Sequence, residues 1–366
     1  MNADTPLFAR ARLQMPNAAG YVRWLIEHLQ QEGVQVVPGD STDSLRLQMD
    51  NVGTLELQAL ADDALDCQIW PVDAPMLALV KMSLIEHAQE FLTRHKLDAQ
   101  AIDIEWDDSG AEDAQARPGL QRLRVLGITN ITPRMRRFRL QAENLQALLL
   151  GGLHVRLLLP EPQDSAVIWP GMGSDGRLQY PEETTARLPQ RIYTIVHSDA
   201  QNGWIEIDML RHGKDLTHSS APGAFWAEHA QPGAELGVIT PAGGRLLAAQ
   251  SMVLIADNCA LPALARQLQA MPADAHAQVL ALVEDESEIR PLPLPARHTV
   301  RWLRTGNAAP AAMTELLLQA VIQLGWNDPQ PGLLWAACGD AQAKALRRWM
   351  REHQSAVKTQ ISSYWR

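Results

Sequence analysis

The sequence predicts a multidomain protein in three folded parts: a small α+β domain, an antiparallel β-barrel, and an α/β domain built on a parallel sheet. Two observations support this order. Residues 119–246 form short strand patterns separated by turn residues, whereas residues 247–366 alternate continuous apolar strands with helices. Ahead of both, residues 1–97 combine two amphipathic helices with a pair of alternating strands.

The first part begins with a helix on which Tyr21, Trp24 and His28 recur at helical spacing, and Gly33 ends it. The stretches SLRLQMD and TLELQALA then alternate like a hairpin, and a second long amphipathic helix follows. Residues 98–118 are acidic, rich in alanine, and end at Pro118, which is typical of a linker.

The middle part is predicted to be a closed barrel, with the helical stretch APGAFWAEHA before its last strand. Its expected strands are LQRLRVLGITNI, MRRFRLQA, HVRLLLP, GRLQYP, RIYTIV, WIEIDML and AELGVITP. In the last part, helices separate the strands SMVLIAD, AQVLALVED, HTVRWLR and GLLWAACG. This rhythm predicts a doubly wound parallel sheet with its ligand at the carboxyl ends of the strands.

Composition excludes several classes of protein. Hydrophobic residues make up 46% and charged residues 20% of 366 residues, enough for the cores of two or three soluble domains. The net charge of −10 argues against a nucleic-acid partner, because no basic stripe offsets it. The amino-terminal residues hold no apolar leader and no uncharged run reaches membrane-spanning length, so we expect a cytoplasmic protein without membrane insertion.

Metal chemistry is also not expected. Cys67, Cys259 and Cys338 lie far apart, without metal-knuckle or iron–sulfur spacing, and buried packing is their expected role. His28 and His87 lie on the two helices of the first part, but one histidine per helix without a third ligand favours packed or capping histidines. Any electron carrier is therefore expected to be organic.

One barrel strand, in the run LPQRIYTIVHSD, is patterned unusually. It alternates Arg191, Tyr193 and Thr194 with isoleucines. Two interpretations fit these residues. The run is either a barrel strand with a surface arginine, or a flavin platform that offers an aromatic ring, a hydroxyl and a cation.

Nine motifs in order favour the platform. They are TPRMRRFRL, HVRLLLP, RIYT, IEIDMLRHG, APGAFWAEHAQPG, ADNCALPALAR, VRWLR, WAACGDAQAKALRR and the terminal YWR. From residue 119 onward the chain resembles the siderophore-interacting protein family, FAD-dependent ferric-siderophore reductases of ferredoxin-reductase-like architecture. The first part resembles a small domain of unknown function that is fused to some members, with EHAQEFL as its best match.

The resemblance implies that the barrel binds FAD. Tyr193 would lie on the isoalloxazine ring, Thr194 would bond near its reactive nitrogen, and Arg191 would neutralise phosphate; the first two are the implied catalytic pair. The remaining implied FAD-binding residues are His154, His212, Gly213, Gly223, Ala224 and Trp226. Of these, Trp226 and His154 are equally well explained as packing residues.

The chain departs from the family pattern near these residues. The family has a second arginine two residues after the threonine, and Val196 stands there. His197 would substitute only if the strand shifts or bulges. The family's Gly-Pro-Ala is Ala221-Pro222-Gly223, and the loop before it is several residues long.

The last part is implied to bind NADPH or NADH at its first strand-to-helix turn, through Asp257 and Asn258, although Gly-x-Gly-x-x-Gly is absent. Arg301 and Arg304 favour NADPH, whereas the acidic run EDESE favours NADH. The resemblance to the family implies NADPH of the two. The terminal Tyr364-Trp365-Arg366 would cap the flavin face until nicotinamide displaces it, with a plain surface tail as the alternative.

The expected function is NAD(P)H-dependent, FAD-mediated reduction of a ferric siderophore with release of Fe(II). The anionic chelate would meet the cations Arg245, Lys358 and Arg366. Two other functions stay open: a non-catalytic siderophore- or flavin-binding protein, and a general NAD(P)H:flavin reductase.

Overall fold

The structure is a computed structural model, and it forms two compact units, Met1–Leu120 with Ile168–Arg187 and Gln121–Val167 with Leu188–Arg366. Each unit is described by itself. The residues that the structure describes are 7–31, 36–39, 41–49, 52–72, 74–98, 101–107, 120–149, 153–162, 166–172, 178–181, 187–211, 217–239, 246–326 and 330–365.

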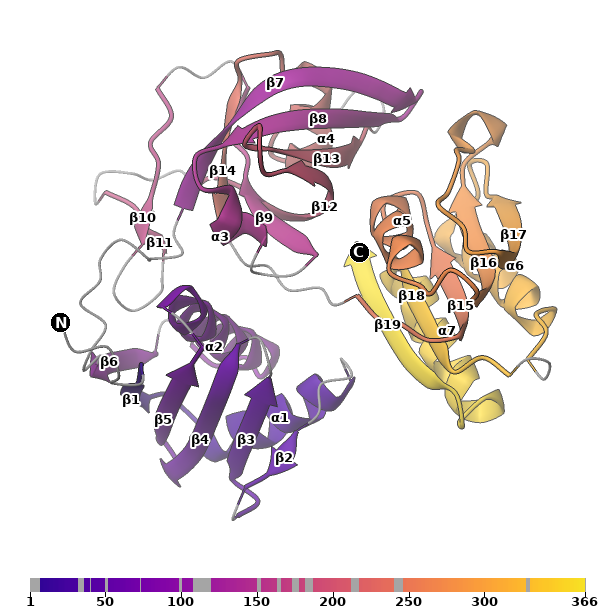
Figure 1. The fold of residues 1–366 in the computed structure, drawn as a ribbon. Helices are drawn as coiled ribbons and strands as arrows, with labels where there is room; N and C mark the ends of the chain where they lie inside the picture. Colours follow the sequence, from indigo (N-terminus) through magenta and orange to yellow (C-terminus); the bar gives the residue numbers. More distant parts are fainter. Residues whose placement is uncertain are drawn as a thin grey trace. The chain divides into compact units, whose positions relative to one another are not determined.

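The first unit contains a six-stranded antiparallel sheet of order β2-β3-β4-β5-β1-β6. Its strands are β1 (Ala9–Gln14), β2 (Val37–Pro38), β3 (Ser44–Met49), β4 (Gly53–Ala61), β5 (Ala64–Pro71) and β6 (Asp103–Asp107). Helices α1 (Ala18–Gln31) and α2 (Ala74–Arg94) lie against the sheet (Figure 1). Apolar residues of both helices and of the sheet form one hydrophobic core. This confirms the predicted α+β class.

The predicted linker is wrong over part of its length. Residues Asp103–Asp107 form β6, which pairs antiparallel with β1 along the sheet edge. Ile104 and Trp106 pack on the core, because alternate side chains of a strand point to the same face. Acidic residues alternate with these two side chains, so the segment is polar overall and its strand pattern was not recognised. Residues 108–119 lie outside the described part of the chain.

The two histidines of the first unit lie together. The rings of His28 and His87 meet edge to face with centroids 5.4 Å apart, and Trp24 stacks on His28 at 4.9 Å. Among the described residues, no group of three or more His, Cys, Asp or Glu side chains is placed to hold a metal. The histidines therefore belong to an aromatic cluster between α1 and α2.

In the second unit, six strands close a barrel in the order β12-β13-β8-β7-β14-β9. They are β7 (Leu120–Thr132), β8 (Met135–Ala142), β9 (His154–Leu158), β12 (Gln190–Asp199), β13 (Trp204–Leu210) and β14 (Glu235–Ile239). The predicted strand GRLQYP is not among them. Its Leu178–Gln179 form β11, which belongs to the first unit and pairs with β10 (Gly171–Met172) in a two-stranded sheet of the described residues. A closed barrel leaves no free edge for a seventh strand.

Two short helices accompany the barrel, α3 (Leu145–Leu149) and α4 (Pro222–His229). Helix α4 precedes the last strand, as predicted. Its Trp226 is fully buried in the barrel core and packs on Phe138 with ring centroids 5.0 Å apart. Trp226 is thus a packing residue in this structure.

The α/β part has a parallel five-stranded sheet of order β17-β16-β15-β18-β19. Its elements are β15 (Ser251–Ala256), α5 (Leu261–Gln269), β16 (His276–Val283), the 3-10 helix η1 (Glu286–Glu288), β17 (Arg297–Arg304), α6 (Pro310–Ile322), β18 (Leu333–Gly339), α7 (Asp340–His353) and β19 (Lys358–Trp365). Helix α5 contributes to the core on one face, and α6 with α7 to the core on the other (Figure 1). This arrangement confirms the predicted doubly wound sheet.

Strand β19 was not predicted, because its sequence KTQISSYW is mostly polar. It is the edge strand beside β18, and only Ile361 in it is fully buried. As a result, the terminal Tyr-Trp pair is part of the sheet. The structure thus corrects the alternative of a plain surface tail.

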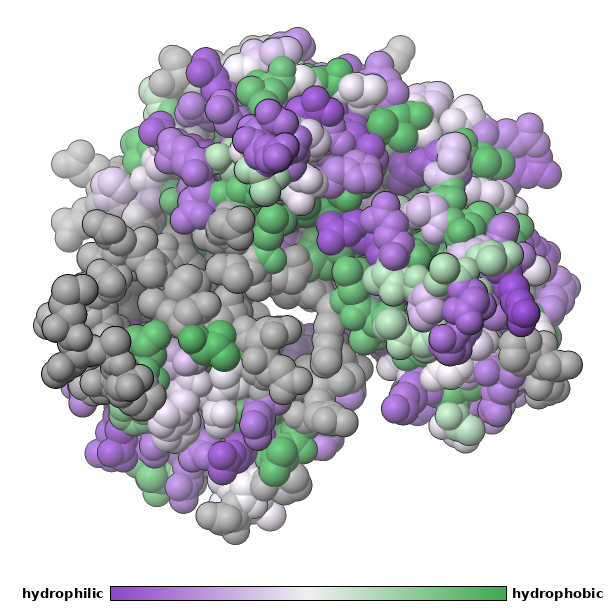
Figure 2. All heavy atoms as spheres, viewed as in Figure 1, coloured by the Kyte–Doolittle hydropathy of each residue, from purple (hydrophilic) through white to green (hydrophobic). Residues whose placement is uncertain are grey.

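The visible face in Figure 2 mixes hydrophilic and hydrophobic residues over the barrel and the α/β part. No helix among the described residues is both long and apolar enough to cross a membrane. Cys67, Cys259 and Cys338 are free; the first and last are buried, as expected.

Candidate functional site

Strand β12 carries the predicted flavin platform. It pairs with β9 so that Tyr193 lies opposite Val155 and Thr194 lies opposite His154. Arg191 is exposed, Tyr193 is half-buried against the barrel core, and Thr194 is 6% exposed. The three side chains therefore run from solvent at Arg191 toward the interior at Thr194.

The phenol of Tyr193 lies against the first turn of α4. A Cβ added at Gly223 would lie 2.1 Å from Tyr193 Oη and 3.9 Å from Arg191 Cγ, so only glycine fits there without a shift. The helix begins at Pro222, and Ala221 before it offers no side-chain cap to the N–H groups of that turn. Arg191 and an uncapped helix start thus meet at one end of β12.

Thr194, in the middle of β12, forms a chain of hydrogen bonds with two other residues. Thr194 Oγ1 lies 3.2 Å from Nδ1 of His154, and Tyr364 Oη lies 3.1 Å from Nε2 of the same ring. Tyr364 comes from β19, and its ring meets the imidazole edge to face. Both nitrogens of His154 are therefore bonded to hydroxyl groups.

Burial lowers the pKa of His154 to about 4. The nearby Arg266 guanidinium lowers this pKa further, and a hydrogen bond with the Tyr193 backbone raises it. The imidazole is consequently neutral at neutral pH, with one ring nitrogen that donates and one that accepts.

Trp365 is held at the first strand-to-helix turn of the α/β part. Its Nε1 donates to Asp257 Oδ2 at 2.6 Å. The ring lies against Gly339, where an added Cβ would lie 2.6 Å from it. Burial raises the pKa of Asp257 to about 6, although the bond from Trp365 acts in the opposite direction.

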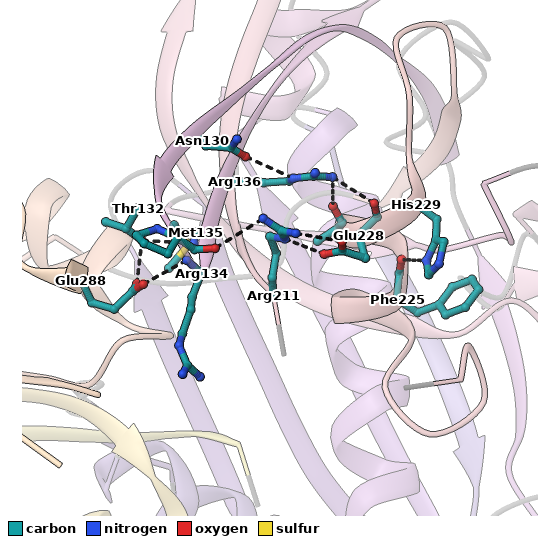
Figure 3. Close-up of polar contacts among 12 residues, drawn as sticks. Asn130, Thr132, Arg134, Met135, Arg136, Arg211, Phe225, Glu228, His229 and Glu288 are labelled. Atoms are coloured by element: carbon teal, nitrogen blue, oxygen red, sulfur yellow. Dashed lines mark hydrogen bonds and ion pairs between the residues drawn. The ribbon is translucent and has the colours of Figure 1, made fainter. Parts of the chain in front are cut away.

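A buried carboxylate joins this turn to the barrel. Glu288 is 0% exposed; it accepts from Thr132 Oγ1 at 2.6 Å, from Arg134 N at 2.9 Å and from Asn258 Nδ2 at 3.3 Å. Figure 3 shows Glu288 directed at the turn between β7 and β8. An ion pair between Arg134 and Glu284, the residue after β16, also holds this turn. Glu288 thus connects the β7–β8 turn with Asn258.

Helix α4 is anchored on the barrel at its other end. Arg136 Nη1 donates to the carbonyls of Ala227 and Glu228, both at 2.9 Å, and Arg211 pairs with the Glu228 carboxylate (Figure 3). A cation at these carbonyls satisfies the last turn of the helix, while its first turn stays uncapped. The uncapped turn is therefore held in place by bonds remote from the candidate site.

Two family descriptions match consecutive parts of the chain. Residues 124–245 match the siderophore-interacting FAD-binding domain, and residues 249–366 match the siderophore-interacting protein description. A siderophore utilization protein from T. fusca superposes with a TM-score of 0.59 and 30% identity, over 68% of this chain and 94% of that one. The chain belongs to the siderophore-interacting protein family.

Other relatives within this family have named functions. The ferric vibriobactin reductase ViuB of Vibrio cholerae is 28% identical over 59% of this chain and 77% of the relative. The ferric acinetobactin reductase of Acinetobacter baumannii is 29% identical over 48% of this chain and 60% of the relative. The siderophore-interacting protein SipS of Aeromonas hydrophila superposes with a TM-score of 0.53 and 25% identity, over 68% of this chain and 99% of that one.

The residues of β12 and α4 fit the FAD that the family match assigns to the barrel. Arg191 has no carboxylate partner among the described residues; its Nη1 donates to the Gln190 carbonyl at 2.7 Å. An unpaired cation beside uncapped N–H groups at Gly223 and Ala224 is the donor set that a pyrophosphate requires. An aromatic ring and a hydroxyl follow at Tyr193 and Thr194.

The departure at Val196 has a structural counterpart. The register between β12 and β13 shifts between Ile195 and His197, so the strand contains the bulge on which substitution by His197 depended. His197 is exposed, and it lies on the far side of Thr194 from Arg191, about 20 Å along the strand at roughly 3.3 Å per residue. His197 therefore does not lie beside Arg191.

The two arginines considered for NADPH have partners. Arg301 Nη1 donates to Gln323 Oε1 at 2.6 Å, and Arg304 pairs with Glu286. Arg304 ends β17 and lines a pocket at the carboxyl ends of β16 and β17 with Glu284, Asp285 and Glu286. Arg304, which favoured NADPH in the sequence, and the acidic run, which favoured NADH, thus meet in one ion pair.

Several predicted site residues are not brought to β12. Lys358 is exposed at the start of β19, at the opposite end of that strand from Tyr364, so it does not lie beside the residues that contact β12. Trp226 lies in the barrel core. His212, Gly213, Arg245 and Arg366 lie outside the described residues.

The sequence did not predict the contacts that three residues make at the site. Arg266 of α5 donates to the Ile195 carbonyl beside the bulge, Tyr364 bonds His154, and Glu288 joins the β7–β8 turn to Asn258. Arg266 and Tyr364 were inside recognised motifs. Glu288 ends the acidic run EDESE, and its burial was not predicted because an acidic run is usually a solvated surface.

Proposed function

We propose that this protein reduces ferric siderophores with electrons taken from NAD(P)H through FAD, and so releases Fe(II). The observation that carries the proposal is the arrangement of Arg191, Tyr193 and Thr194 beside the uncapped start of α4, in a barrel of the family's FAD-binding type. The named ferric-siderophore reductases among the relatives support the same reaction.

FAD, when bound, accepts a hydride from nicotinamide and passes electrons on singly. The residues of this chain would bind and orient it. Arg191 and the N–H groups of Gly223 and Ala224 would hold the pyrophosphate, Tyr193 would support the ring, and Thr194 would bond at the ring edge.

Reduction suits the release of this cargo. Siderophores hold Fe(III) through hard oxygen ligands, which match the higher charge, so a divalent ion leaves more readily. The chemistry requires no general base and no nucleophile. A cation near the ring would attract the anionic chelate. Arg266 is proposed for this role, because it is half-buried and has no carboxylate partner among the residues described.

The hydride donor is proposed to be NADH in preference to NADPH. Glu284, Asp285 and Glu286 follow β16, where an acidic residue binds the ribose hydroxyls of NADH and repels the 2′-phosphate of NADPH. Arg304, the residue that would bind this phosphate, is already paired with Glu286.

The test uses the full chain. The visible absorption spectrum of the purified protein shows whether flavin is bound, and release of FAD on denaturation identifies it. Anaerobic addition of NADH, then of a ferric catecholate or hydroxamate chelate with a chromogenic Fe(II) trap, measures turnover. We expect bound FAD, bleaching by NADH, and Fe(II) formed at two ions per NADH consumed.

Other outcomes identify the alternatives. A colourless protein that binds chelate without turnover would be a siderophore-binding protein. Rapid reduction of free flavin, with iron reduced equally well by the free flavin without protein, would make it a general flavin reductase. Either result contradicts the proposed function.

A further inference from the structure

Three side chains form an unbroken hydrogen-bonded row from the barrel interior toward its surface. Thr194 is 6% exposed, whereas His154 and Tyr364 are half-buried. The hydrogen bonds measure 3.2 Å from Thr194 Oγ1 to His154 Nδ1 and 3.1 Å from His154 Nε2 to Tyr364 Oη. The three residues come from β12, β9 and β19, so the row exists only once the barrel and the α/β part are folded together.

The proposed reaction leaves a proton behind. Oxidation of one NAD(P)H by two ferric ions balances as NAD(P)H + 2 Fe(III) → NAD(P)⁺ + 2 Fe(II) + H⁺. The two electrons go to the two irons, and the hydrogen nucleus that arrived with them has to leave as H⁺. That proton needs a path from the flavin edge to solvent, and Thr194 at that edge is buried.

We propose that Thr194, His154 and Tyr364 form a proton relay that carries this proton from the flavin edge of the site toward solvent. The inference rests on the proposed function. Thr194 Oγ1 receives the proton and passes one to Nδ1 of His154; the ring releases its other proton from Nε2 to Tyr364 Oη. Each hydroxyl loses one O–H bond and gains another, and the ring changes from its Nε2–H to its Nδ1–H tautomer, which has to be reset by proton exchange with solvent before the next transfer.

A neutral imidazole between two hydroxyls suits this role. It accepts at one nitrogen while it donates at the other, and each transfer converts one tautomer to the other. The groups that face His154 are Thr194 and the Tyr193 backbone from β12, Tyr364 from β19 and Arg266 from α5. The cation among them disfavours a stable imidazolium, so the proton does not stay on the ring.

The bonds themselves are tested in the free protein. With ¹⁵N-labelled histidine, we expect a neutral His154 ring whose Nε2 resonance moves in Tyr364→Phe and whose Nδ1 resonance moves in Thr194→Val. His298 is the matched control, because its Nδ1 bonds the Pro295 carbonyl at 2.7 Å away from this row. Unmoved His154 resonances in both variants would overturn the relay.

Transfer is tested in the FAD-loaded protein with His154→Gln, which keeps amide hydrogen bonds but cannot shuttle a proton. We expect FAD to stay bound and Fe(II) release from a ferric catecholate chelate to fall at least about 10-fold. Added imidazole should restore part of the rate, since a small carrier replaces the missing step. Tyr364→Phe should behave alike, and His298→Gln should keep the wild-type rate.

The remaining results separate the relay from the proposed function. Wild-type rates in both variants, or a loss that imidazole does not restore, would overturn the relay and leave ferric reduction standing. A wild-type protein that binds FAD but releases no Fe(II) would overturn both, because no proton would then need to leave.

Discussion

Thr132 Oγ1 donates a 2.6 Å hydrogen bond to Glu288 Oε2, although 156 residues separate the two in sequence. Thr132 ends a barrel strand and Glu288 ends the 3-10 helix that follows β16. Glu288 also accepts from Arg134 and from Asn258, which stands in the first strand-to-helix turn of the α/β part. One buried carboxylate thus sets the position of that turn relative to the barrel.

Glu288→Gln should destabilise the second unit. The amide presents a single acceptor oxygen where the carboxylate used both, so at least one buried donor loses its partner, at a cost of about 1–3 kcal/mol. Chemical denaturation followed by tryptophan fluorescence measures the change. Glu286→Gln, in the same 3-10 helix but with a 75% exposed side chain, should change stability by less than about 0.5 kcal/mol. Equal effects of the two substitutions would contradict the role given to Glu288.

Gly223→Ala should destabilise the protein and weaken FAD binding. The new methyl group would lie 2.1 Å from Tyr193 Oη, so Tyr193 or the start of α4 has to move, at a cost of about 1–3 kcal/mol. The control removes the clash: in a Tyr193→Phe background the next ring atom is 3.4 Å away. There, Gly223→Ala should be neutral or stabilising by up to about 1 kcal/mol, since alanine favours a helix. The sign change is measured by a double-mutant cycle, and its absence would show that Tyr193 does not contact this turn.

Glu286→Gln should improve the use of NADPH. It frees Arg304 from an exposed ion pair worth about 1 kcal/mol or less, and it removes a negative charge near the 2′-phosphate. We expect kcat/KM for NADPH to rise by up to about 5-fold, a figure that corresponds to about 1 kcal/mol, while the value for NADH changes little. Glu315→Gln on α6 is the charge-matched control. A larger gain for NADH than for NADPH would place the 2′-phosphate elsewhere.

His154 should make stability fall with acid. Its folded pKa of about 4 lies below the ordinary value of 6.5, so the unfolded chain takes up a proton that the folded chain refuses. Wild-type protein should therefore lose, relative to His154→Gln, on the order of 3 kcal/mol of unfolding free energy as pH falls from 6.5 toward 4. Above pH 6.5 the difference between the two proteins should be constant. Comparing them cancels Asp257, whose raised pKa acts in the opposite direction. A flat difference across this window would show that His154 is not buried as described.

Sequence alone determined the class of each part and the platform strand. Six barrel strands and four parallel strands could be predicted from the sequence. Strands and helices differ in the period of their apolar residues, and turns are marked by residues such as glycine and proline. Arg191 and Tyr193 could be predicted as neighbours because alternate residues of a strand share a face, whereas Thr194, the next residue, points to the other face and was included through the family motif. Strands β6 and β19 were missed, since edge strands bury few side chains and their polar residues mask the period.

Only the tertiary structure decided which distant residues meet. The pairing of Thr194 with His154 depends on the register of β12 against β9, and the bond to Tyr364 depends on a strand more than 200 residues away. The meaning of the acidic run depended on the fold as well: Glu288 is buried, whereas Glu286 of the same run is exposed and paired with Arg304. Local pattern reports the period of a segment, but it carries no information about which neighbour covers it, and that neighbour sets burial, charge and hydrogen bonding at the site.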